Sequence, residues 1–155
     1  HQDGLVHVSQ ITNVKAAEAL CKIAPEHDLI ITAESKGIPL AYEMSRYLGG
    51  QRYVLARKSV KLYMKDVITT EVDSITTDHL QKLCIGGDEA EAMKGKRILI
   101  VDDVISLGES LKAVQKLVNK AEGVIVGNMT ILAEGDAAKR DDIIFLEELP
   151  LFFHD

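Results

Sequence analysis

Two adjacent carboxylates, Asp102 and Asp103, follow an apolar run over residues 98–101 and precede a short loop of small residues. The loop leads into a stretch with helical spacing that begins near Glu109. A buried strand that ends in two acids beside a helix N-terminus presents backbone N–H groups and a positive dipole end to an anion such as phosphate. The paired carboxylates suit hydroxyl groups or a divalent cation with oxygen ligands. A sugar phosphate with a metal ion would satisfy both halves of this pattern.

The first third of the chain alternates helical and strand patterns. Apolar residues at helical spacing predict a helix over residues 13–24, which Pro25 stops. A continuous apolar run predicts a buried strand over residues 29–33. A second helix that starts near Pro39 and a strand over residues 52–57 follow. This α-β-α-β order predicts a parallel sheet.

Residues 58–96 break this alternation, because they are polar, rich in threonine and without helical period until a short helix over residues 88–93. We expect a mobile lid over residues 58–79, with a hairpin-like pair of strands near residues 71–76 and 80–85. A long excursion inside a compact domain is typical of a functional lid or binding loop. An ordinary surface hairpin is the alternative.

The last third returns to regular patterns after the acid pair. Apolar spacing predicts a helix over residues 109–121, and apolar runs predict strands over residues 124–132 and 143–146. The apolar tail over residues 150–153 is expected to pack against the domain or face a partner. We find no internal repeat and expect one domain over residues 1–155.

The composition excludes several classes of protein. An apolar fraction of 46% and a charged fraction of 27% are ordinary for a globular protein. The net charge of −6 argues against nucleic-acid binding, and neither a membrane span nor a signal peptide is recognisable. The spacing of Cys21 and Cys84 fits no metal-binding motif, so we expect reduced core thiols in a cytoplasmic protein.

The letters ILIVDD also open the receiver domains of phosphorelay proteins. In those domains this strand lies at the N-terminus, and a phosphate-accepting aspartate ends a later strand. Here two βα units come first, and Asp141 and Asp142 precede the last strand, at the wrong end of the sheet. The order of elements therefore disfavours a receiver domain.

Taken whole, residues 97–110 resemble the phosphoribosyl-pyrophosphate (PRPP) signature of type I phosphoribosyltransferases. Residues 34–37, ESKG, stand where that family has its short pyrophosphate loop. Residues 56–64 look like the RK…K segment of adenine phosphoribosyltransferases, and residues 148–152 are similar to their C-terminal strand. The resemblance extends in order over residues 28–153.

The resemblance implies a three-layer α/β fold of the phosphoribosyltransferase type. Its mostly parallel twisted sheet has strand order 3-2-1-4-5-6, with strand 3 antiparallel, and it carries a small hood with a flexible loop. The implied activity is Mg²⁺-dependent transfer of the 5-phosphoribosyl group from PRPP to a purine base, adenine first. The reaction gives a nucleotide and pyrophosphate in purine salvage. A homodimer is implied, with neither nucleic-acid nor membrane partners.

The resemblance also assigns roles to individual residues. Asp102 and Asp103 are expected to bind the ribose hydroxyls, directly or through Mg²⁺, and with Lys58 to form the catalytic set. The loop expected to wrap the 5′-phosphate comprises Val104, Ile105, Ser106, Leu107, Gly108, Glu109 and Ser110. The residues expected to bind pyrophosphate are Glu34, Ser35, Lys36, Gly37, Arg57, Lys58 and Lys61. In the family the loop over residues 34–37 often carries a non-proline cis peptide.

Two residues depart from the family pattern. Leu107 stands where the family usually has threonine, and Glu109 stands where glycine is frequent. Leu107 removes a phosphate-binding hydroxyl, and Glu109 adds negative charge near an anionic ligand. These departures leave open a PRPP-sensing regulator of the same fold without turnover, and also an accessory or interaction protein.

The base-binding residues have the weakest signal. Residues 132–135 and the pair Phe152 and Phe153 are candidates for the base pocket, whereas Asp78 and His79 near the lid are candidates for proton transfer. None of them identifies the base, and xanthine or guanine follows adenine as a candidate.

Overall fold

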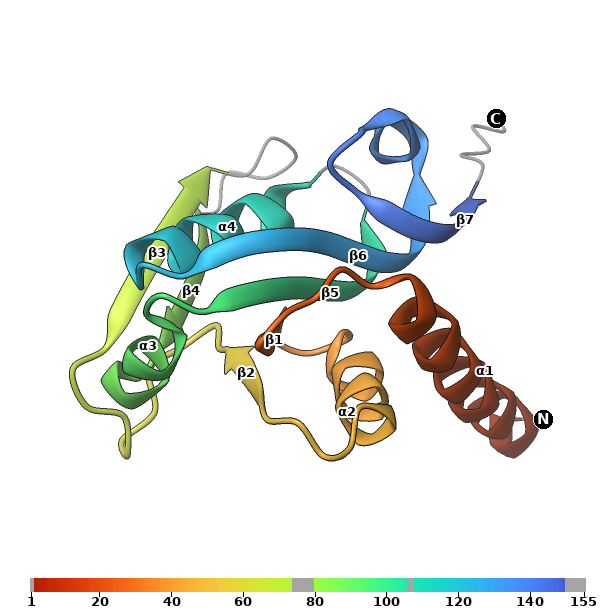
Figure 1. Cartoon of the computed structure of the whole chain (residues 1–155), viewed down its shortest axis with the longest axis horizontal. Helices are drawn as coiled ribbons and strands as arrows, with labels where there is room; N and C mark the ends of the chain where they lie inside the picture. Colours follow the sequence, from red (N-terminus) through yellow and green to blue (C-terminus); the bar gives the residue numbers. More distant parts are fainter. Residues whose placement is uncertain (1, 74–79, 106–107, 150–155) are drawn as a thin grey trace.

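A five-stranded sheet with strand order β2-β1-β5-β6-β7 forms the middle of the protein in the computed structural model (Figure 1). The structure describes residues 2–73, 80–105 and 108–149. All neighbouring strands in this sheet are parallel. The strands are β1 (Leu29–Ala33), β2 (Tyr53–Ala56), β5 (Arg97–Ile105), β6 (Val124–Glu134) and β7 (Ile144–Leu149).

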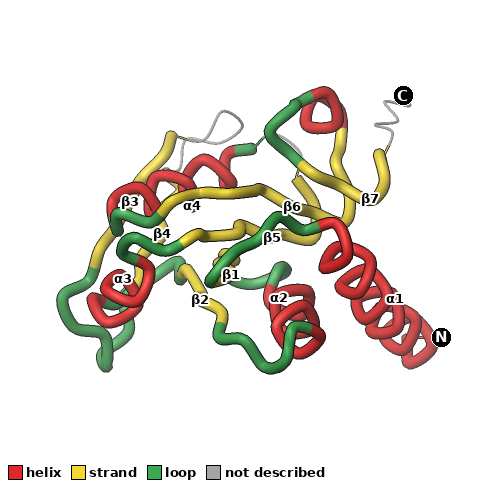
Figure 2. Tube along the Cα trace, viewed as in Figure 1, coloured by secondary structure: helices red, strands yellow, loops and turns green. Residues whose placement is uncertain are grey.

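Helices cover both faces of the sheet (Figure 2). The helices are α1 (Gln2–Ile23), α2 (Ile38–Tyr47), α3 (Gly87–Met93) and α4 (Glu109–Lys120), with a 3₁₀ turn, η1 (Gly135–Lys139), between β6 and β7. Leu99 and Val101 of β5 pack in a core with α1 and α2. Ile98 and Ile100 pack in a second core with α3 and α4. Alternate residues of one apolar strand therefore pack into the cores on the two opposite faces of the sheet, as expected for a strand covered on both faces.

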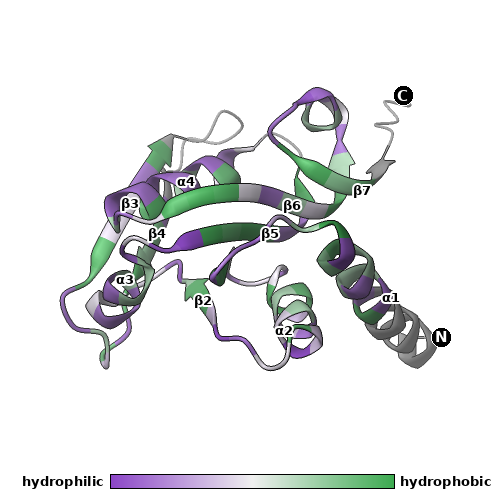
Figure 3. Cartoon of the chain, viewed as in Figure 1, coloured by the Kyte–Doolittle hydropathy of each residue, from purple (hydrophilic) through white to green (hydrophobic). Residues whose placement is uncertain are grey.

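Apolar residues gather along these central strands, where both faces are covered (Figure 3). No helix in the described ranges is long and apolar enough to cross a membrane. Both cysteines are free thiols, with Cys84 buried and Cys21 half-buried. Burial raises the pKa of Cys21 to about 11, so its thiol is a poor nucleophile near neutral pH.

A small antiparallel sheet contains β3 (Ile68–Asp73) and β4 (Leu80–Ile85). The expected hairpin is confirmed, although its first strand begins at Ile68 instead of near Glu71. An antiparallel bridge between Arg57 and Cys84 joins β4 to the end of β2. Strand 3 of the expected order corresponds to β4, and strands 4, 5 and 6 correspond to β5, β6 and β7, so the expected order 3-2-1-4-5-6 is confirmed. β4 joins the edge of the five-stranded sheet through this one bridge and forms its ladder with β3.

Two expected boundaries are wrong. The expected strand ended in the two acids, but β5 continues past them to Ile105 because β6 stays paired with it as far as Ala133. The first helix begins at Gln2 instead of Asn13. No proline lies between these two residues, so nothing in the backbone forces a helix start at Asn13.

Candidate active site

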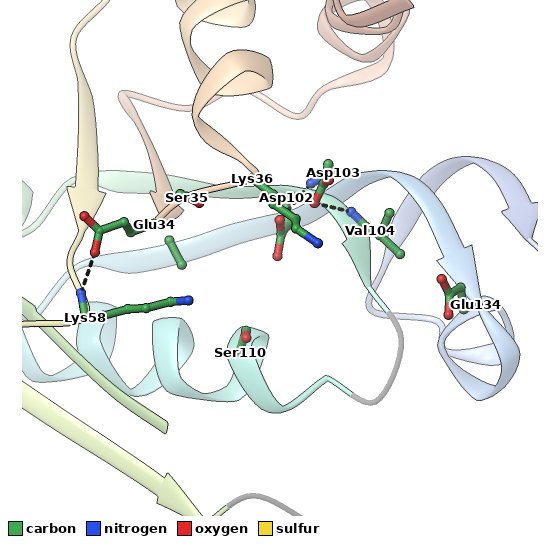
Figure 4. A pocket seen from close by; sticks show the side chains of 10 residues that line it. Glu34, Ser35, Lys36, Lys58, Asp102, Asp103, Val104, Ser110 and Glu134 are labelled. Carbon is green, nitrogen blue, oxygen red and sulfur yellow. Dashed lines mark hydrogen bonds between the residues drawn. The ribbon is translucent and has the colours of Figure 1, made fainter. Parts of the chain in front are cut away.

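A pocket of about 450 Å³ opens at the carboxyl ends of β1 and β5 (Figure 4). The β1–β5 ladder ends at the pair Ile31 and Ile100, whereas β1 stays paired with β2 as far as Ala33 and β5 with β6 as far as Ile105. This is the switch point where open α/β sheets bind ligands. The pocket is lined by Ala33, Glu34, Ser35, Lys36, Lys58, Asp102, Asp103, Val104, Ser110 and Glu134.

The loop after β1 contributes Glu34, Ser35 and Lys36 to the pocket. The Glu34–Ser35 peptide bond is cis, which confirms the expectation for this loop. Gly37 is buried below the loop, and a Cβ at this position would overlap Thr32 Oγ1 and lie 3.3 Å from Asp102 Oδ1. The glycine therefore allows the loop to settle directly against β1 and the acid pair.

The Glu34 carboxylate joins this loop to the segment after β2. Its Oε2 accepts a hydrogen bond from the Lys58 backbone N–H at 3.0 Å, and its Oε1 lies 3.6 Å from Arg57 Nη1. The Lys58 side chain reaches into the pocket from one side (Figure 4). The Arg57 guanidinium instead lies 6.0 Å from the centre of the Tyr63 ring and does not line the pocket.

Backbone N–H groups fix the acid pair within β5. Asp102 Oδ1 accepts from the N–H of Asp103, and Asp103 Oδ1 accepts from the N–H of Val104, both at 2.8 Å. Burial, together with the neighbouring Asp103 carboxyl, raises the pKa of the Asp102 carboxyl to about 7, although the Asp103 N–H and the positive charge of Lys36 oppose the shift. Asp102 can therefore exchange a proton near neutral pH, which suits a group that binds hydroxyls.

The N-terminus of α4 closes the pocket below the acid pair. Gly108 caps the helix with φ of +80°, a left-handed conformation that glycine adopts without penalty. Ser110, in the first turn, lines the pocket. The N–H groups and the dipole at the N-terminal end of a helix favour an anion. Ser106 and Leu107 lie outside the described residues, so their expected contacts stay predictions.

Several expected site residues lie elsewhere. The Ile105 side chain is buried in the core with α4, so only its backbone is available to a ligand. Lys61 does not line the pocket, and its Nζ donates to Ser59 Oγ at 3.4 Å. The candidates Asp78 and His79 lie outside the described residues, as do Phe152 and Phe153.

Two pocket residues had little or no individual signal in the sequence. Ala33 was not expected, and Glu134 appeared only within the candidate range 132–135. Ala33 ends β1, and Glu134 ends β6. Their shared signal is their position at the carboxyl end of a parallel strand, where the pocket of such a sheet forms.

The acid pair alone is a weak metal site. Within residues 2–73, 80–105 and 108–149, no three His, Cys, Asp or Glu side chains converge to hold a metal ion. Mg²⁺ is commonly bound by one or two carboxylates together with substrate phosphates and water. Asp102 and Asp103 therefore fit Mg²⁺ when a phosphorylated ligand supplies most of the coordination.

Comparison with known proteins gives a consistent family. Residues 7–150 match the family model described as phosphoribosyl transferase domain. A hypoxanthine/guanine phosphoribosyltransferase of Ferroglobus placidus is 29% identical over 89% of this chain and 70% of its own length. An adenine phosphoribosyltransferase of Bifidobacterium longum is 34% identical over 74% of this chain and 56% of its own length. A xanthine phosphoribosyltransferase of Clostridium perfringens is 33% identical over 70% and 56%.

Solved structures show the same fold. The crystal structure of an adenine phosphoribosyltransferase from Thermoanaerobacter pseudethanolicus matches with a TM-score of 0.75 and 26% identity. The match covers 88% of this chain and 80% of that one. By contrast, the chain spans little more than half the length of the adenine and xanthine relatives above, at 56%.

Proposed function

The chain belongs to the phosphoribosyl transferase domain family, and from this premise we propose that it transfers the 5-phosphoribosyl group of PRPP to a purine base. The products are a purine nucleotide and pyrophosphate. The observation that carries the proposal is that one pocket unites the loop after β1, Lys58, the acid pair and Ser110. These groups provide cationic, hydroxyl-binding and phosphate-binding chemistry side by side.

The pyrophosphate group binds at the end of the pocket lined by Glu34, Ser35, Lys36 and Lys58. Negative charge accumulates on pyrophosphate as it leaves C1 of the ribose, and the two lysines stabilise that charge. Glu34 carries negative charge itself, and its role is to hold the Lys58 backbone beside the loop. Glu34 is therefore a positioning residue in this scheme.

The ribose binds over Asp102 and Asp103, whose carboxylates accept hydrogen bonds from the 2′- and 3′-hydroxyls. The 5′-phosphate binds at the N-terminus of α4, next to Gly108 and Ser110. Asp102 and Asp103 would hold Mg²⁺, directly or through water, and the ion would neutralise charge on the phosphates of PRPP. The protein supplies no nucleophile, so catalysis consists of positioning and charge stabilisation.

The base binds at the opposite end of the pocket, toward Glu134. Attack on C1 comes from the face opposite to the leaving group, and Glu134 lies across the pocket from Glu34 and Lys58 (Figure 4). The carboxylate of Glu134 accepts hydrogen bonds from an amino group and repels an oxo group. This chemistry favours adenine, with its 6-amino group, over hypoxanthine and xanthine.

The lid proposed over residues 58–79 excludes water from the activated ribose. Its described part includes residues 58–67, which form no helix or strand, and β3. Val60, Leu62 and Tyr63 in this segment are exposed by 53%, 107% and 69%, so apolar surface is available for closure. We place the activity in cytoplasmic purine salvage by a homodimer, as the family resemblance implies.

A base panel tests the proposal. The chain is incubated with MgCl₂, PRPP and adenine, hypoxanthine, guanine, xanthine, orotate or uracil, and pyrophosphate release is followed. We expect release only when a purine is present, fastest with adenine. PRPP binding without release for any base would contradict the proposal and support a PRPP-sensing regulator. Comparable release without a base would contradict the role of the lid.

A further inference from the structure

Arg140 lies against the N-terminal end of α4, although it follows η1 and is far from that helix in sequence. A Cβ added to Gly108 would lie 2.7 Å from Arg140 Nη1 and 4.0 Å from its Cζ. The guanidinium therefore occupies the space that a side chain at position 108 would need. Gly108 satisfies two requirements at once, its left-handed backbone and the close approach of Arg140.

Asp142 holds the Arg140 guanidinium in a two-bond arrangement. Arg140 Nε donates to Asp142 Oδ1 at 2.9 Å, and Nη2 donates to Asp142 Oδ2 at 2.6 Å. Such paired bonds fix the plane of a guanidinium as well as its position. Neither bond uses Nη1, the nitrogen beside Gly108. The arrangement thus directs one cationic donor group at the start of α4.

Hydrogen bonds through the buried Asn128 fix Asp142 in turn. Asn128 Nδ2 donates to the Asp142 carbonyl at 3.0 Å, and Gln115 Nε2 donates to Asn128 Oδ1 at 3.3 Å. Asn128 is only 6% exposed in β6, where an apolar residue would avoid the cost of burying an amide. These hydrogen bonds link α4, β6 and the segment before β7. Through Asp142 they hold the Arg140 guanidinium beside the first residues of α4.

We propose that Arg140 binds the 5′-phosphate of the phosphoribosyl substrate through Nη1, together with the N-terminal N–H groups of α4. The inference rests on the proposed function and adds a residue outside the phosphate loop itself. A phosphate with two negative charges gains more from a guanidinium than from a neutral hydroxyl. Arg140 thus offsets the two departures of the loop, the missing hydroxyl at Leu107 and the negative charge of Glu109.

Binding measurements with three ligands test this role. Ribose 5-phosphate, PRPP and inorganic pyrophosphate are titrated into the wild-type chain and into Arg140→Ala, Arg140→Lys and Arg46→Ala. Arg46 is the matched control, since it pairs with Glu43 at 3.0 Å on α2, away from the pocket residues. We expect Arg140→Ala to weaken ribose 5-phosphate and PRPP about tenfold or more, the loss typical of a charge-assisted hydrogen bond. Pyrophosphate affinity should change by less than about twofold.

The conservative variant separates charge from structure. Arg140→Lys keeps the charge without the paired bonds to Asp142, so it should recover part of the lost affinity, while Arg46→Ala should bind all three ligands like wild type. Unchanged ribose 5-phosphate binding in Arg140→Ala would overturn the inference, as would an equal loss of pyrophosphate binding. If Arg140→Ala lowers the melting temperature so far that the variant is unfolded in the assay, ribose 5-phosphate binding and pyrophosphate binding are compared in Arg140→Lys instead. Turnover by wild type with unaltered ligand binding in the variants would reject the inference and leave the proposed function intact.

Discussion

The Glu34 carboxylate accepts a hydrogen bond from the Lys58 backbone N–H at 3.0 Å, which ties the loop after β1 to the segment after β2. The second oxygen of the same carboxylate lies 3.6 Å from Arg57 Nη1. Both groups of that ion pair are partly exposed, so its contribution to stability is small. The hydrogen bond matters more, because it sets the place from which the Lys58 side chain enters the pocket.

Removing this acceptor should weaken pyrophosphate binding. We expect Glu34→Ala to raise the Kd for inorganic pyrophosphate about fivefold, the equivalent of one lost hydrogen bond of roughly 1 kcal/mol. Glu34→Gln keeps an oxygen acceptor for the Lys58 N–H and should lose less. Glu43→Gln, on α2, is the control for removal of a carboxylate. Equal or tighter pyrophosphate binding by Glu34→Ala would show that the lysine needs no such anchor.

The raised pKa of Asp102 predicts a pH-dependent stability. Its folded-state pKa of about 7 lies above 3.8, the ordinary pKa of an aspartate side chain. Between these values the folded chain retains a proton that the unfolded chain has released, so this carboxyl lowers the free energy of unfolding as pH rises. The penalty is complete above pH 7 or so and absent below about pH 4.

The variant Asp102→Asn removes that titration and keeps an oxygen acceptor for the Asp103 N–H. We expect its melting temperature to rise relative to wild type as pH goes from 5 to 8, by about 2–4 °C for each kcal/mol regained. Thermal melts of both chains at several pH values measure the difference. A difference that stays constant across this pH range would refute the assigned titration.

Gly37 and Thr32 should be energetically coupled. Gly37→Ala places a methyl group onto Thr32 Oγ1, and overpacking of this kind costs about 1–3 kcal/mol. Thr32 is fully buried, and its hydroxyl finds no partner among the described residues, so Thr32→Ala removes the obstacle without breaking a hydrogen bond in that part of the chain. Urea unfolding of the single and double variants gives the coupling. A double variant as unstable as the sum of both singles would exclude direct contact.

The acid pair should be needed for binding and dispensable for folding. We expect the double variant Asp102→Asn/Asp103→Asn to lose PRPP binding while it retains the circular dichroism spectrum and a cooperative melt. The reason is that both changes preserve side-chain shape and remove only charge and acceptor capacity. Calorimetric titration with Mg²⁺ and PRPP measures the loss. Micromolar PRPP binding by the folded double variant would refute the assigned ribose site.

Local patterns were sufficient to predict most of the fold. The apolar run of β1 and the helical spacing of α4 are properties of neighbouring residues, and both elements lie where they were expected. The extension of β5 to Ile105 was missed because it depends on pairing with β6, a segment distant in sequence. The resemblance correctly anticipated where β4 meets β2, which no local pattern contains.

The site was predictable where a motif is continuous in sequence. Ser35, Lys36, Asp102 and Asp103 come together in one pocket because their segments follow adjacent parallel strands. Lys61 was expected there from its place in a motif, but its side chain turns to Ser59 instead. The position of Arg140 beside the start of α4 could not be predicted, because it depends on Asp142 and the buried amide of Asn128, contacts that leave no pattern in the local sequence.

The most direct test of the central claim is ³¹P nuclear magnetic resonance of PRPP with Mg²⁺, adenine and the wild-type chain. Transfer predicts that free pyrophosphate and the 5′-phosphate signal of AMP appear together in equal amounts. Neither signal should appear with Asp102→Asn/Asp103→Asn. Unchanged PRPP signals in the presence of adenine, hypoxanthine, guanine and xanthine in turn would contradict the assignment of a phosphoribosyltransferase activity to this pocket.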